Sequence, residues 1–275
     1  TKGVVVDFSS LKINMNDDKL PSFDAPTDAI IYELSVRDMT SMKGTSIRHK
    51  GKFLGLTETS CKSKNNNPIG LDYLKYLGIT HVQLMPIFDF CTICDENPTE
   101  SYNWGYDPLF YNTPEGSYST NVSDPYSRII ELKKMVSTFH KYGIRVVMDV
   151  VYNHVFNLEN SCFEKICPSY YFRYKEDGTP SNGSFCGNEF NSSHPMARKF
   201  IIDSCLHWVK EYGIDGFRFD LMGLIDIDTI NQIKKECSKL KPNFIIYGEG
   251  WDMPTTLSSD KMSKMYNANK MLEIG

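Results

Sequence analysis

The chain alternates between short apolar runs and longer stretches in which apolar residues recur every three or four positions. The runs that predict strands span residues 30–36, 81–86, 144–150, 215–220 and 244–249. The stretches that predict helices begin near residues 67, 124, 194 and 226. Near-continuous apolar strands between helices indicate a parallel sheet. The order therefore predicts an α/β protein, either a (β/α) barrel or an open doubly wound sheet.

A repeated glycine step marks where three of the predicted helices end. The three steps are Leu77-Gly78-Ile79, Tyr142-Gly143-Ile144 and Tyr212-Gly213-Ile214. Glycine just past a helix supplies the left-handed cap, and isoleucine begins the next strand. The helical spacing predicts core faces that include Leu71, Leu74 and Leu77 on the first helix, and Ile230 and Leu240 on the last. Such repeated αβ junctions favour a regular α/β architecture.

Composition allows a full core and excludes two classes of partner. The chain has 275 residues, is 41% hydrophobic and carries a net charge of −4. So mild a charge points to neither nucleic acid nor a membrane surface. No nucleotide-binding glycine motif follows a predicted strand. The chain begins without Met, so we expect a segment of a longer polypeptide.

The predicted organisation has one main unit and a short leading segment. Residues 1–28 are polar and predict a linker or the end of a preceding domain, and residues 29–275 predict part of a barrel. Two long connections, 87–123 and 151–193, follow the carboxyl ends of strands. Barrel enzymes build their sites there, and long ordered loops are usually functional.

The eight cysteines do not form an evident disulfide framework at this length. Cys205 and Cys237 lie on apolar helix stripes, and Cys91 and Cys94 form a lone CxxC, which is weak evidence for metal or redox chemistry. A local disulfide in a secreted protein could use Cys162, Cys167 and Cys186. The cysteine pattern slightly favours a cytoplasmic location over a secreted one.

Polar side chains follow three successive predicted strands where each strand ends. The segments are Asp149-Val150-Val151-Tyr152-Asn153-His154, Arg218-Phe219-Asp220 and Glu249-Gly250-Trp251. A single acidic residue at a strand end often caps a helix, but three such ends together favour a site at one mouth of the sheet. Because Arg218 precedes Asp220 by two residues, both side chains point to the same face of a strand.

Two differently tuned carboxyls at a barrel mouth are typical of glycosidic bond hydrolysis. We expect Arg218 to keep Asp220 ionised, so that Asp220 attacks or stabilises the anomeric carbon. We expect Glu249 to be the acid, because the anion beside it raises its pKa. Asp149 and His154 are candidates for hydrogen bonds to sugar hydroxyls.

The motifs resemble those of a known family. DVVYNH (149–154), GFRFDLMG (216–223) and YGEGW (247–251) resemble the first three conserved regions of glycoside hydrolase family 13, the α-amylase family, in the family's order. YNWGYDP (102–108) together with FDLMG resembles the pullulanase type I branch. The resemblance implies a (β/α)8 TIM barrel, of which about the first five strand-helix units are present, so that the barrel is incomplete in this chain.

The resemblance also implies an activity and roles for the site residues. The activity is retaining hydrolysis of α-1,6-glucosidic links in pullulan, amylopectin and limit dextrins. Asp220 would be the nucleophile, Glu249 the general acid/base, and Arg218 the support of Asp220. The implied substrate ligands are Asp149 and His154 beside the scissile bond, Tyr106 as a stacking platform, and Trp104, Asp107 and Trp251 around the pocket, with Met222 in its wall.

One difference from the family's pattern argues against this activity. The family uses a third carboxylate after its seventh strand, and no matching region follows in this sequence. The alternative is a catalytically incomplete α-glucan-binding fragment, whose partners would be an α-glucan and the rest of the barrel from the same parent polypeptide. The four motifs disfavour a sugar-phosphate enzyme. No cofactor is expected, although Asn153 stands where some relatives place a calcium ligand.

Overall fold

Five parallel strands form one sheet at the centre of the protein, in the order in which they occur along the chain. The structure is a computed structural model that describes residues 3–275. The strands are β1 (Ile31–Leu34), β2 (His81–Leu84), β5 (Arg145–Val150), β6 (Gly216–Phe219) and β7 (Ile245–Gly248). Every neighbouring pair is parallel. The five predicted strands and the parallel sheet are confirmed.

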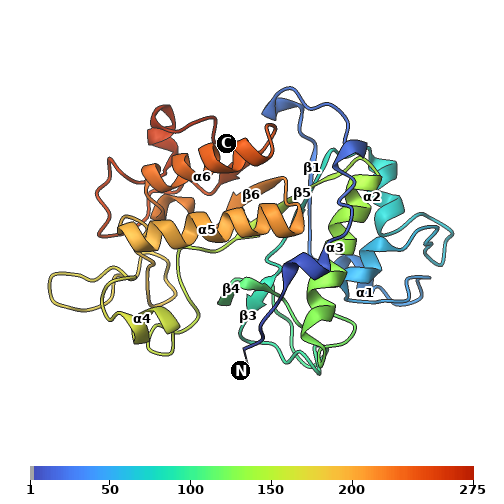
Figure 1. Cartoon of the computed structure of the whole chain (residues 1–275), viewed down its shortest axis with the longest axis horizontal. Helices are drawn as coiled ribbons and strands as arrows, with labels where there is room; N and C mark the ends of the chain where they lie inside the picture. Colours follow the sequence, from blue (N-terminus) through green and yellow to red (C-terminus); the bar gives the residue numbers. More distant parts are fainter. Residues whose placement is uncertain (1–2) are drawn as a thin grey trace.

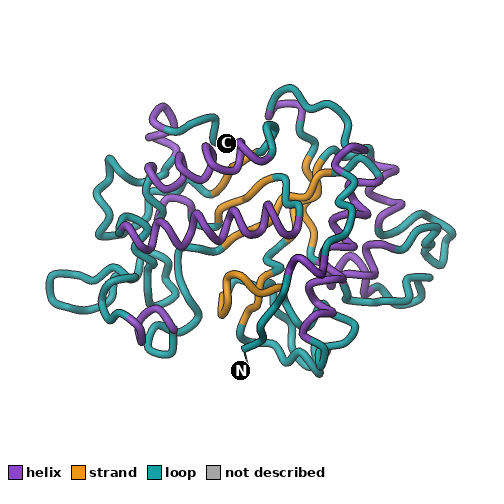
Figure 2. Tube along the Cα trace, in the orientation of Figure 1, coloured by secondary structure: helices purple, strands orange, loops and turns teal. Residues whose placement is uncertain are grey.

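Helices cover the outer face of this sheet, as Figures 1 and 2 show. The helices are α1 (Val36–Ser41), α2 (Leu71–Leu77), α3 (Pro125–Lys141), α4 (Cys162–Ile166), α5 (Pro195–Tyr212) and α6 (Ile227–Leu240). Short 3-10 helices are η1 (Phe8–Leu11), η2 (Asp17–Lys19), η3 (Pro26–Asp28), η4 (Phe53–Thr57), η5 (Met222–Leu224) and η6 (Met265–Lys270). Helices α5 and α6 pack side by side, and α3 contacts both β5 and α5. The four predicted helices are confirmed, but the first begins at Leu71 and not near residue 67, because Pro68 forms a β-bridge with Lys62.

Local sequence explains where these helices begin and end. Asp124 and Asp226 cap α3 and α6 by accepting backbone N–H groups of their first turns. Gly78, Gly143 and Gly213 have φ angles of 71°, 76° and 71°, so the predicted left-handed caps are present at all three junctions. The strand predicted to reach residue 36 instead ends at Leu34, because the Ser35 hydroxyl caps the start of α1.

The core lies between the helices and the sheet. On α5 and α6 the buried side chains include Ile201, Cys205, Trp208, Ile230 and Cys237. The predicted faces fail at their ends, because Leu77 and Leu240 are 40% and 43% exposed. Each is the last residue of its helix, just before the turn that leads into the next strand.

The two long connections carry structure that the sequence pattern did not indicate. The first contains the antiparallel pair β3 (Phe88–Phe90) and β4 (Pro108–Pro114), and the second contains α4. In the described chain all eight cysteines are free, so Cys162, Cys167 and Cys186 form no disulfide here. Within residues 3–275 no helix is long and apolar enough to cross a membrane.

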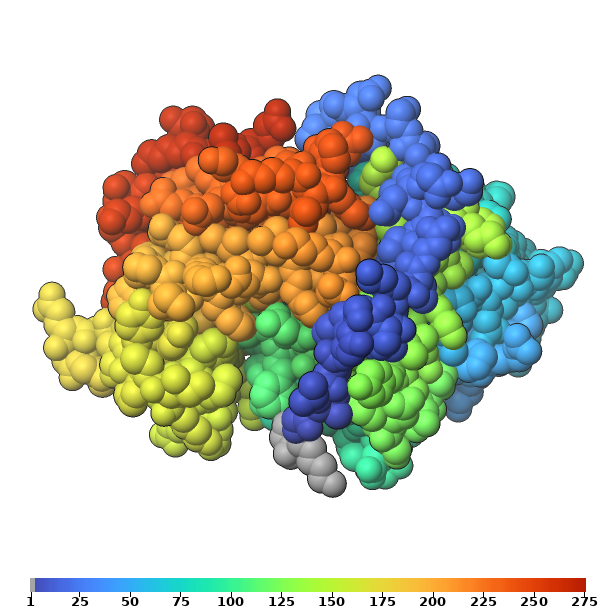
Figure 3. Space-filling model, viewed as in Figure 1, coloured from blue at the N-terminus to red at the C-terminus, as the bar shows by residue number. Residues whose placement is uncertain are grey.

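The segment that precedes β1 packs on the helices. Leu11 accepts a hydrogen bond from Lys133 Nζ through its carbonyl oxygen, and Asn16 Nδ2 donates to Ser137 Oγ at 2.8 Å. The Phe8 ring lies 6.3 Å from the Tyr212 ring on α5. In Figure 3 this segment, in dark blue, crosses the surface between α3 and α5.

Candidate active site

A cleft of about 540 Å³ opens at the carboxyl ends of the strands, which we call the mouth of the sheet. Barrel enzymes carry their sites at this end. The cleft is lined by both charged and aromatic side chains. Its lining residues are Glu33, Asp38, Met85, Tyr102, Trp104, Tyr106, Arg218, Asp220 and Glu249.

Arg218 on β6 brings three carboxylates together. Its Nη1 lies 2.9 Å from Asp149 Oδ2 and 3.1 Å from Asp220 Oδ1. Its Nη2 lies 2.6 Å from Glu249 Oε1. Neighbouring strands place these groups, because Asp149 is the register partner of Arg218 and Glu249 follows β7 directly. One planar guanidinium therefore joins the ends of β5, β6 and β7.

The turn after β6 lies beside Asp220 and Glu249, the acidic residues that follow β6 and β7. Leu221 has a φ of 41°, in the left-handed region that non-glycine residues rarely adopt. Its N–H donates to Glu249 Oε2 at 3.0 Å. Asn153 Nδ2 donates to the Asp220 carboxylate at 2.9 Å. Backbone strain at such a point is typical of functional sites.

Tyr106 reaches the same centre from the long connection after β2. Its hydroxyl donates to Asp149 Oδ2 at 2.8 Å. The preceding Gly105 has a φ of 95°, and a Cβ there would lie 2.8 Å from Pro86. Glycine is thus needed for the loop to fold closely enough to bring Tyr106 over the mouth.

Burial dominates the titration of the carboxyls at the mouth. Burial raises the pKa of Asp149 to about 7, while Arg218 and Tyr106 limit that rise. Burial likewise raises the pKa of Asp220, although Asn153 and Arg218 act in the opposite direction. Arg218 therefore favours the ionised form of Asp220, but burial outweighs it.

His154 lies beneath the cleft. Its ring is buried, with Nδ1 2.5 Å from Asn153 Oδ1 and Nε2 3.1 Å from the Tyr106 carbonyl oxygen. Burial lowers the pKa of His154 to about 4, so the ring is neutral near pH 7. In this structure it supports Asn153 and Tyr106, which themselves contact Asp220 and Asp149.

The other predicted residues divide between the cleft and its surroundings. Trp104 lines the cleft and is 56% exposed, and its Nε1 donates to Tyr102 Oη at 2.7 Å. Asp107 accepts hydrogen bonds from Thr92 and stabilises the loop.

Trp251 is 60% exposed and is not among the described residues that line the cleft. Met222 is buried and packs on Gly248.

Four lining residues were not among the predicted site residues, although Tyr102 begins the motif YNWGYDP (102–108). They are Glu33, Asp38, Met85 and Tyr102. Asp38 accepts a short hydrogen bond from the Tyr102 hydroxyl, and the Arg37 guanidinium lies 5.3 Å from the centre of the Tyr102 ring. Asp38 follows the first strand, so the strand-end rule that found Asp149 could have indicated it too.

A calcium site at Asn153 does not fit the residues present. The side-chain oxygen that would bind the ion lies 2.5 Å from His154 Nδ1, and its amide nitrogen faces Asp220. Among residues 3–275, one group of three His and carboxylate side chains brings its ligand atoms within 4.8 Å of one another. It consists of Asp17, His140 and Asp215, at the opposite end of the sheet.

Comparisons with known proteins identify the family. Residues 69–180 match the family described as "Alpha amylase, catalytic domain". The pullulanase of Bacillus subtilis (strain 168) is 46% identical over 274 residues, which is 100% of this chain and 38% of that protein. Pullulanase A of Streptococcus pneumoniae serotype 4 is 36% identical over 90% of this chain, which covers 20% of that protein.

Solved structures agree in fold. The pullulanase of Paenibacillus barengoltzii in complex with maltohexaose and α-cyclodextrin has a TM-score of 0.94 and 49% identity, over 98% of this chain and 43% of that one. Pullulanase type I of Bacillus subtilis complexed with maltose has a TM-score of 0.91 and 48% identity, over 93% of this chain and 36% of that one. The chain spans well under half the length of these relatives. Its five-stranded parallel sheet corresponds to part of their catalytic barrel, and the chain belongs to the α-amylase family of glycoside hydrolases, glycoside hydrolase family 13.

Proposed function

We propose that this chain carries the nucleophile and the acid/base residue of a retaining hydrolase that cleaves α-1,6-glucosidic links. The observation that carries the proposal is the contact of Arg218 with Asp149, Asp220 and Glu249 at one open mouth. Two carboxyls held by neighbouring nitrogens of one guanidinium lie close together, as the retaining mechanism requires. The similarity to pullulanases over the whole chain supports the same assignment.

Asp220 is the proposed nucleophile. One of its carboxylate oxygens forms a bond to the anomeric carbon while the bond from that carbon to the leaving oxygen breaks. The leaving oxygen takes the proton of Glu249. Water then attacks the glycosyl-enzyme, gives its proton to Glu249 and releases Asp220. Asn153 and Arg218 stabilise the ionised form of Asp220 that starts and ends this cycle.

Glu249 must change its contacts to act as the acid. Both of its oxygens accept hydrogen bonds, from Arg218 Nη2 at 2.6 Å and from the Leu221 N–H at 3.0 Å. Neither oxygen is free to give a proton to a leaving group in this arrangement. We therefore expect a bound glucan to separate Glu249 from Arg218. About a third of the Glu249 side chain is exposed (32%), so it has room to rotate.

The walls of the cleft suit a chain of glucose units. Tyr106 and Trp104 offer ring faces of the kind that stack on sugars. Asp149 and His154, which are buried at and just after the end of β5, are the proposed partners of sugar hydroxyls. A hydroxyl near His154 would replace the Tyr106 carbonyl at Nε2. Related structures are complexes with maltohexaose, maltotetraose or maltotriose. The preference for α-1,6 links rests on YNWGYDP (102–108) and FDLMG (219–223).

A second candidate is an α-glucan-binding fragment without turnover. In the described sheet, β1 and β7 each pair with a strand on one side only. A closed barrel of this kind uses eight strands. Groups that orient the sugar from the other strands contribute orders of magnitude in rate, so this sheet alone could bind a glucan without cleaving it.

Incubation of the chain with pullulan separates these candidates, and linear amylose, which has only α-1,4 links, is the matched substrate control. The proposal predicts maltotriose from pullulan and no new reducing ends from amylose. Maltotriose binding by calorimetry without pullulan cleavage would support the binding fragment instead. Absence of both binding and cleavage would contradict both candidates.

A further inference from the structure

The segment 14–23 lies against the amino-terminal ends of the strands, which we call the bottom of the sheet. Phe23 is buried there, and its ring lies 4.9 Å from the ring of His81, the first residue of β2. Arg145, the first residue of β5, donates from Nη2 to the Pro21 carbonyl oxygen at 2.7 Å. The segment is therefore fixed to the end of the sheet opposite the cleft.

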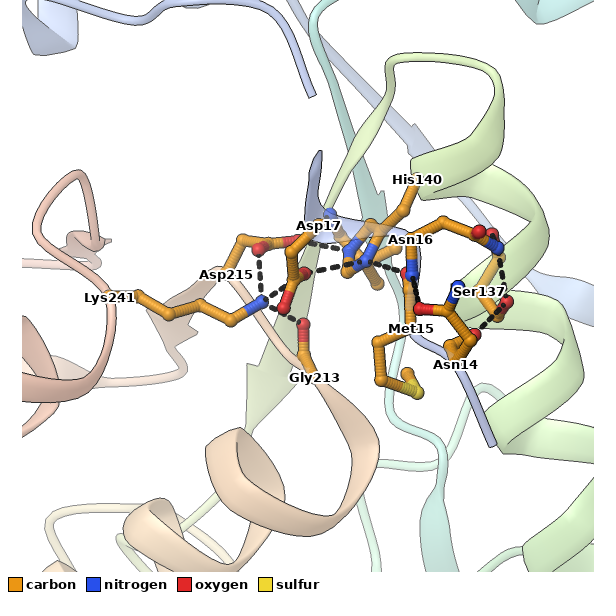
Figure 4. Close-up of polar contacts among 10 residues, drawn as sticks. Asn14, Met15, Asn16, Asp17, Ser137, His140, Gly213, Asp215 and Lys241 are labelled. Carbon is orange, nitrogen blue, oxygen red and sulfur yellow. Dashed lines mark hydrogen bonds and ion pairs between the residues drawn. The ribbon is translucent and has the colours of Figure 1, made fainter. Parts of the chain in front are cut away.

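One fully buried histidine stands between this segment and the sheet. We call its group the His140 cluster, which consists of Asp17, His140, Asp215 and Lys241. His140 Nδ1 lies 2.8 Å from the Met15 carbonyl oxygen and 3.0 Å from Asp17 Oδ1. Its Nε2 lies 2.7 Å from Asp215 Oδ2. Figure 4 shows the ring between the two carboxylates.

The contacts define the protonation state of His140. A neutral imidazole has one N–H and one acceptor nitrogen. Here both nitrogens face oxygen atoms that only accept, namely carboxylates and a carbonyl. Only the doubly protonated ring donates to both sides, and the two carboxylates beside His140 stabilise the charge that this requires.

Lys241 completes the balance of charge. Its Nζ lies 2.6 Å from Asp215 Oδ1, 2.6 Å from the Gly213 carbonyl oxygen and 3.2 Å from Asp17 Oδ1. With His140 charged, the cluster holds two cations and two anions. Loss of the His140 proton leaves an excess negative charge, and a ring nitrogen then faces an oxygen lone pair with no hydrogen between them.

A metal ion does not explain the cluster. The ammonium of Lys241 already lies against both carboxylates, where an ion would have to bind. The two carboxylates also contact opposite nitrogens of His140, so the ring lies between them and no single ring nitrogen faces both. Their arrangement fits a bridge between two carboxylates.

The charged groups around His140 come from several neighbouring elements. Asp17 comes from η2, Asp215 from the turn before β6, and Lys241 from the end of α6. Arg145 on β5 also interacts electrostatically with Asp215, while His81 on β2 is buried with a pKa lowered to about 4 and stays neutral near pH 7. Within the cluster, His140 is thus the group that changes charge between neutral and alkaline pH.

We propose that the His140 cluster is an ionic clasp, which fixes the segment 14–23 to the bottom of the sheet and releases it when His140 loses its proton. Asp17 is the member that belongs to the segment, so every ion pair between the clasp and the segment involves this side chain. The clasp joins residues more than two hundred positions apart, since the separation of Asp17 and Lys241 is 224.

The direction of the pH effect follows from the surroundings of the ring. Burial lowers the pKa of His140, but Asp215 and Asp17 outweigh burial and raise it to about 9. A histidine whose pKa is raised by folding contributes stability fully below its unfolded pKa, and the contribution is lost as pH rises through the folded value. The clasp is therefore closed near pH 7 and opens as pH rises through about 9.

Limited trypsin digestion with mass spectrometry tests the clasp. The measured quantity is cleavage after Lys12 and Lys19, divided by cleavage after the exposed Lys43 in the same sample, which cancels the pH dependence of the protease. We expect this ratio to rise with pH by up to about tenfold per unit between the pKa of a free histidine, about 6.5, and the raised pKa of His140, about 9, because release is linked to loss of one proton in that window. Above about pH 9 the ratio should level off.

Three variants make the test specific. Asp17→Asn removes the charge of the segment and should give a high ratio already at pH 7.5. His140→Gln should give a high ratio that does not change with pH. Asp18→Asn is the matched control, because Asp18 is exposed and pairs with Lys19, and it should behave as the parent chain does. A flat ratio in the parent chain up to pH 10, or an Asp17→Asn ratio equal to that of Asp18→Asn, would overturn the proposal.

Discussion

Two ends of the same sheet hold clusters of charge, and they are built differently. At the mouth, the single cation Arg218 contacts three carboxylates, and the group opens into a cleft of about 540 Å³. At the bottom, the His140 cluster pairs two cations with two anions around a ring with no exposed surface. A balanced and enclosed cluster holds parts together. An unbalanced and open one retains carboxylates that can react.

The largest expected effect is at the mouth. Asp220→Asn should lower pullulan hydrolysis by about 10³-fold or more, because an amide cannot form the glycosyl-enzyme. The fold should persist, since the amide can still contact Asn153 and Arg218. Reducing-end release is the measurement. Asp203→Asn, on the exposed side of α5 in a pair with Lys199, is the control and should keep full activity.

The second prediction compares the cations of the two ends. Arg218→Met leaves three carboxylates without their shared cation and should lower the free energy of unfolding by about 3 kcal/mol. Lys241→Met should cost roughly 1 kcal/mol, because His140 remains between the two carboxylates. Urea unfolding at pH 7 measures both. Equal losses would remove the distinction between an unbalanced mouth and a balanced bottom.

The third prediction separates the two ends by pH. Folding raises the pKa of Asp149 at the mouth to about 7, so its contribution to stability falls as pH rises from about 4 through 7. Folding raises the pKa of His140 to about 9, so its contribution is lost between about pH 6.5 and 9. We expect a loss of about 2 kcal/mol in the alkaline window by urea unfolding. His140→Gln should abolish that loss, whereas Asp149→Asn should leave it unchanged.

The smallest expected effect concerns the loop that covers the mouth. Tyr106→Phe removes one hydrogen bond to Asp149 and should lower the free energy of unfolding by about 1 kcal/mol. The ring face remains, so maltotriose affinity should change little by calorimetry. A large loss of affinity would show that the hydroxyl, and not the ring, carries the contribution of Tyr106 to the site.

The repeating architecture could be predicted from the sequence because each cue is local. Gly78, Gly143 and Gly213 each end a helix through their own backbone conformation. Arg218 and Asp220 share a face because successive side chains of a strand point to opposite sides. Their ion pair in the structure follows from this alternation. Such rules need only a few neighbouring residues, so they hold without knowledge of the tertiary structure.

The remainder depends on contacts between distant parts of the chain. The pair β3–β4 has irregular register, which no periodic pattern reveals. Leu77 and Leu240 keep the helical spacing, yet both are exposed, because burial at the last residue of a helix depends on tertiary packing and not on spacing. The His140 cluster joins residues from four separate segments, and nothing in the sequence near Asp17 indicates His140. Its prediction needs the three-dimensional arrangement.

The central claim is that Asp220 forms the bond to the sugar, and a trapping reagent tests it most directly. A 5-fluoro-α-glucosyl fluoride reacts with the nucleophile of a retaining α-glucosidase and leaves slowly, so the labelled residue can be located by peptide mass spectrometry. The account predicts one 5-fluoroglucosyl group on the peptide that contains Asp220, and none after Asp220→Asn. A label on Asp149 or Glu249, or no label on the folded chain, would contradict it.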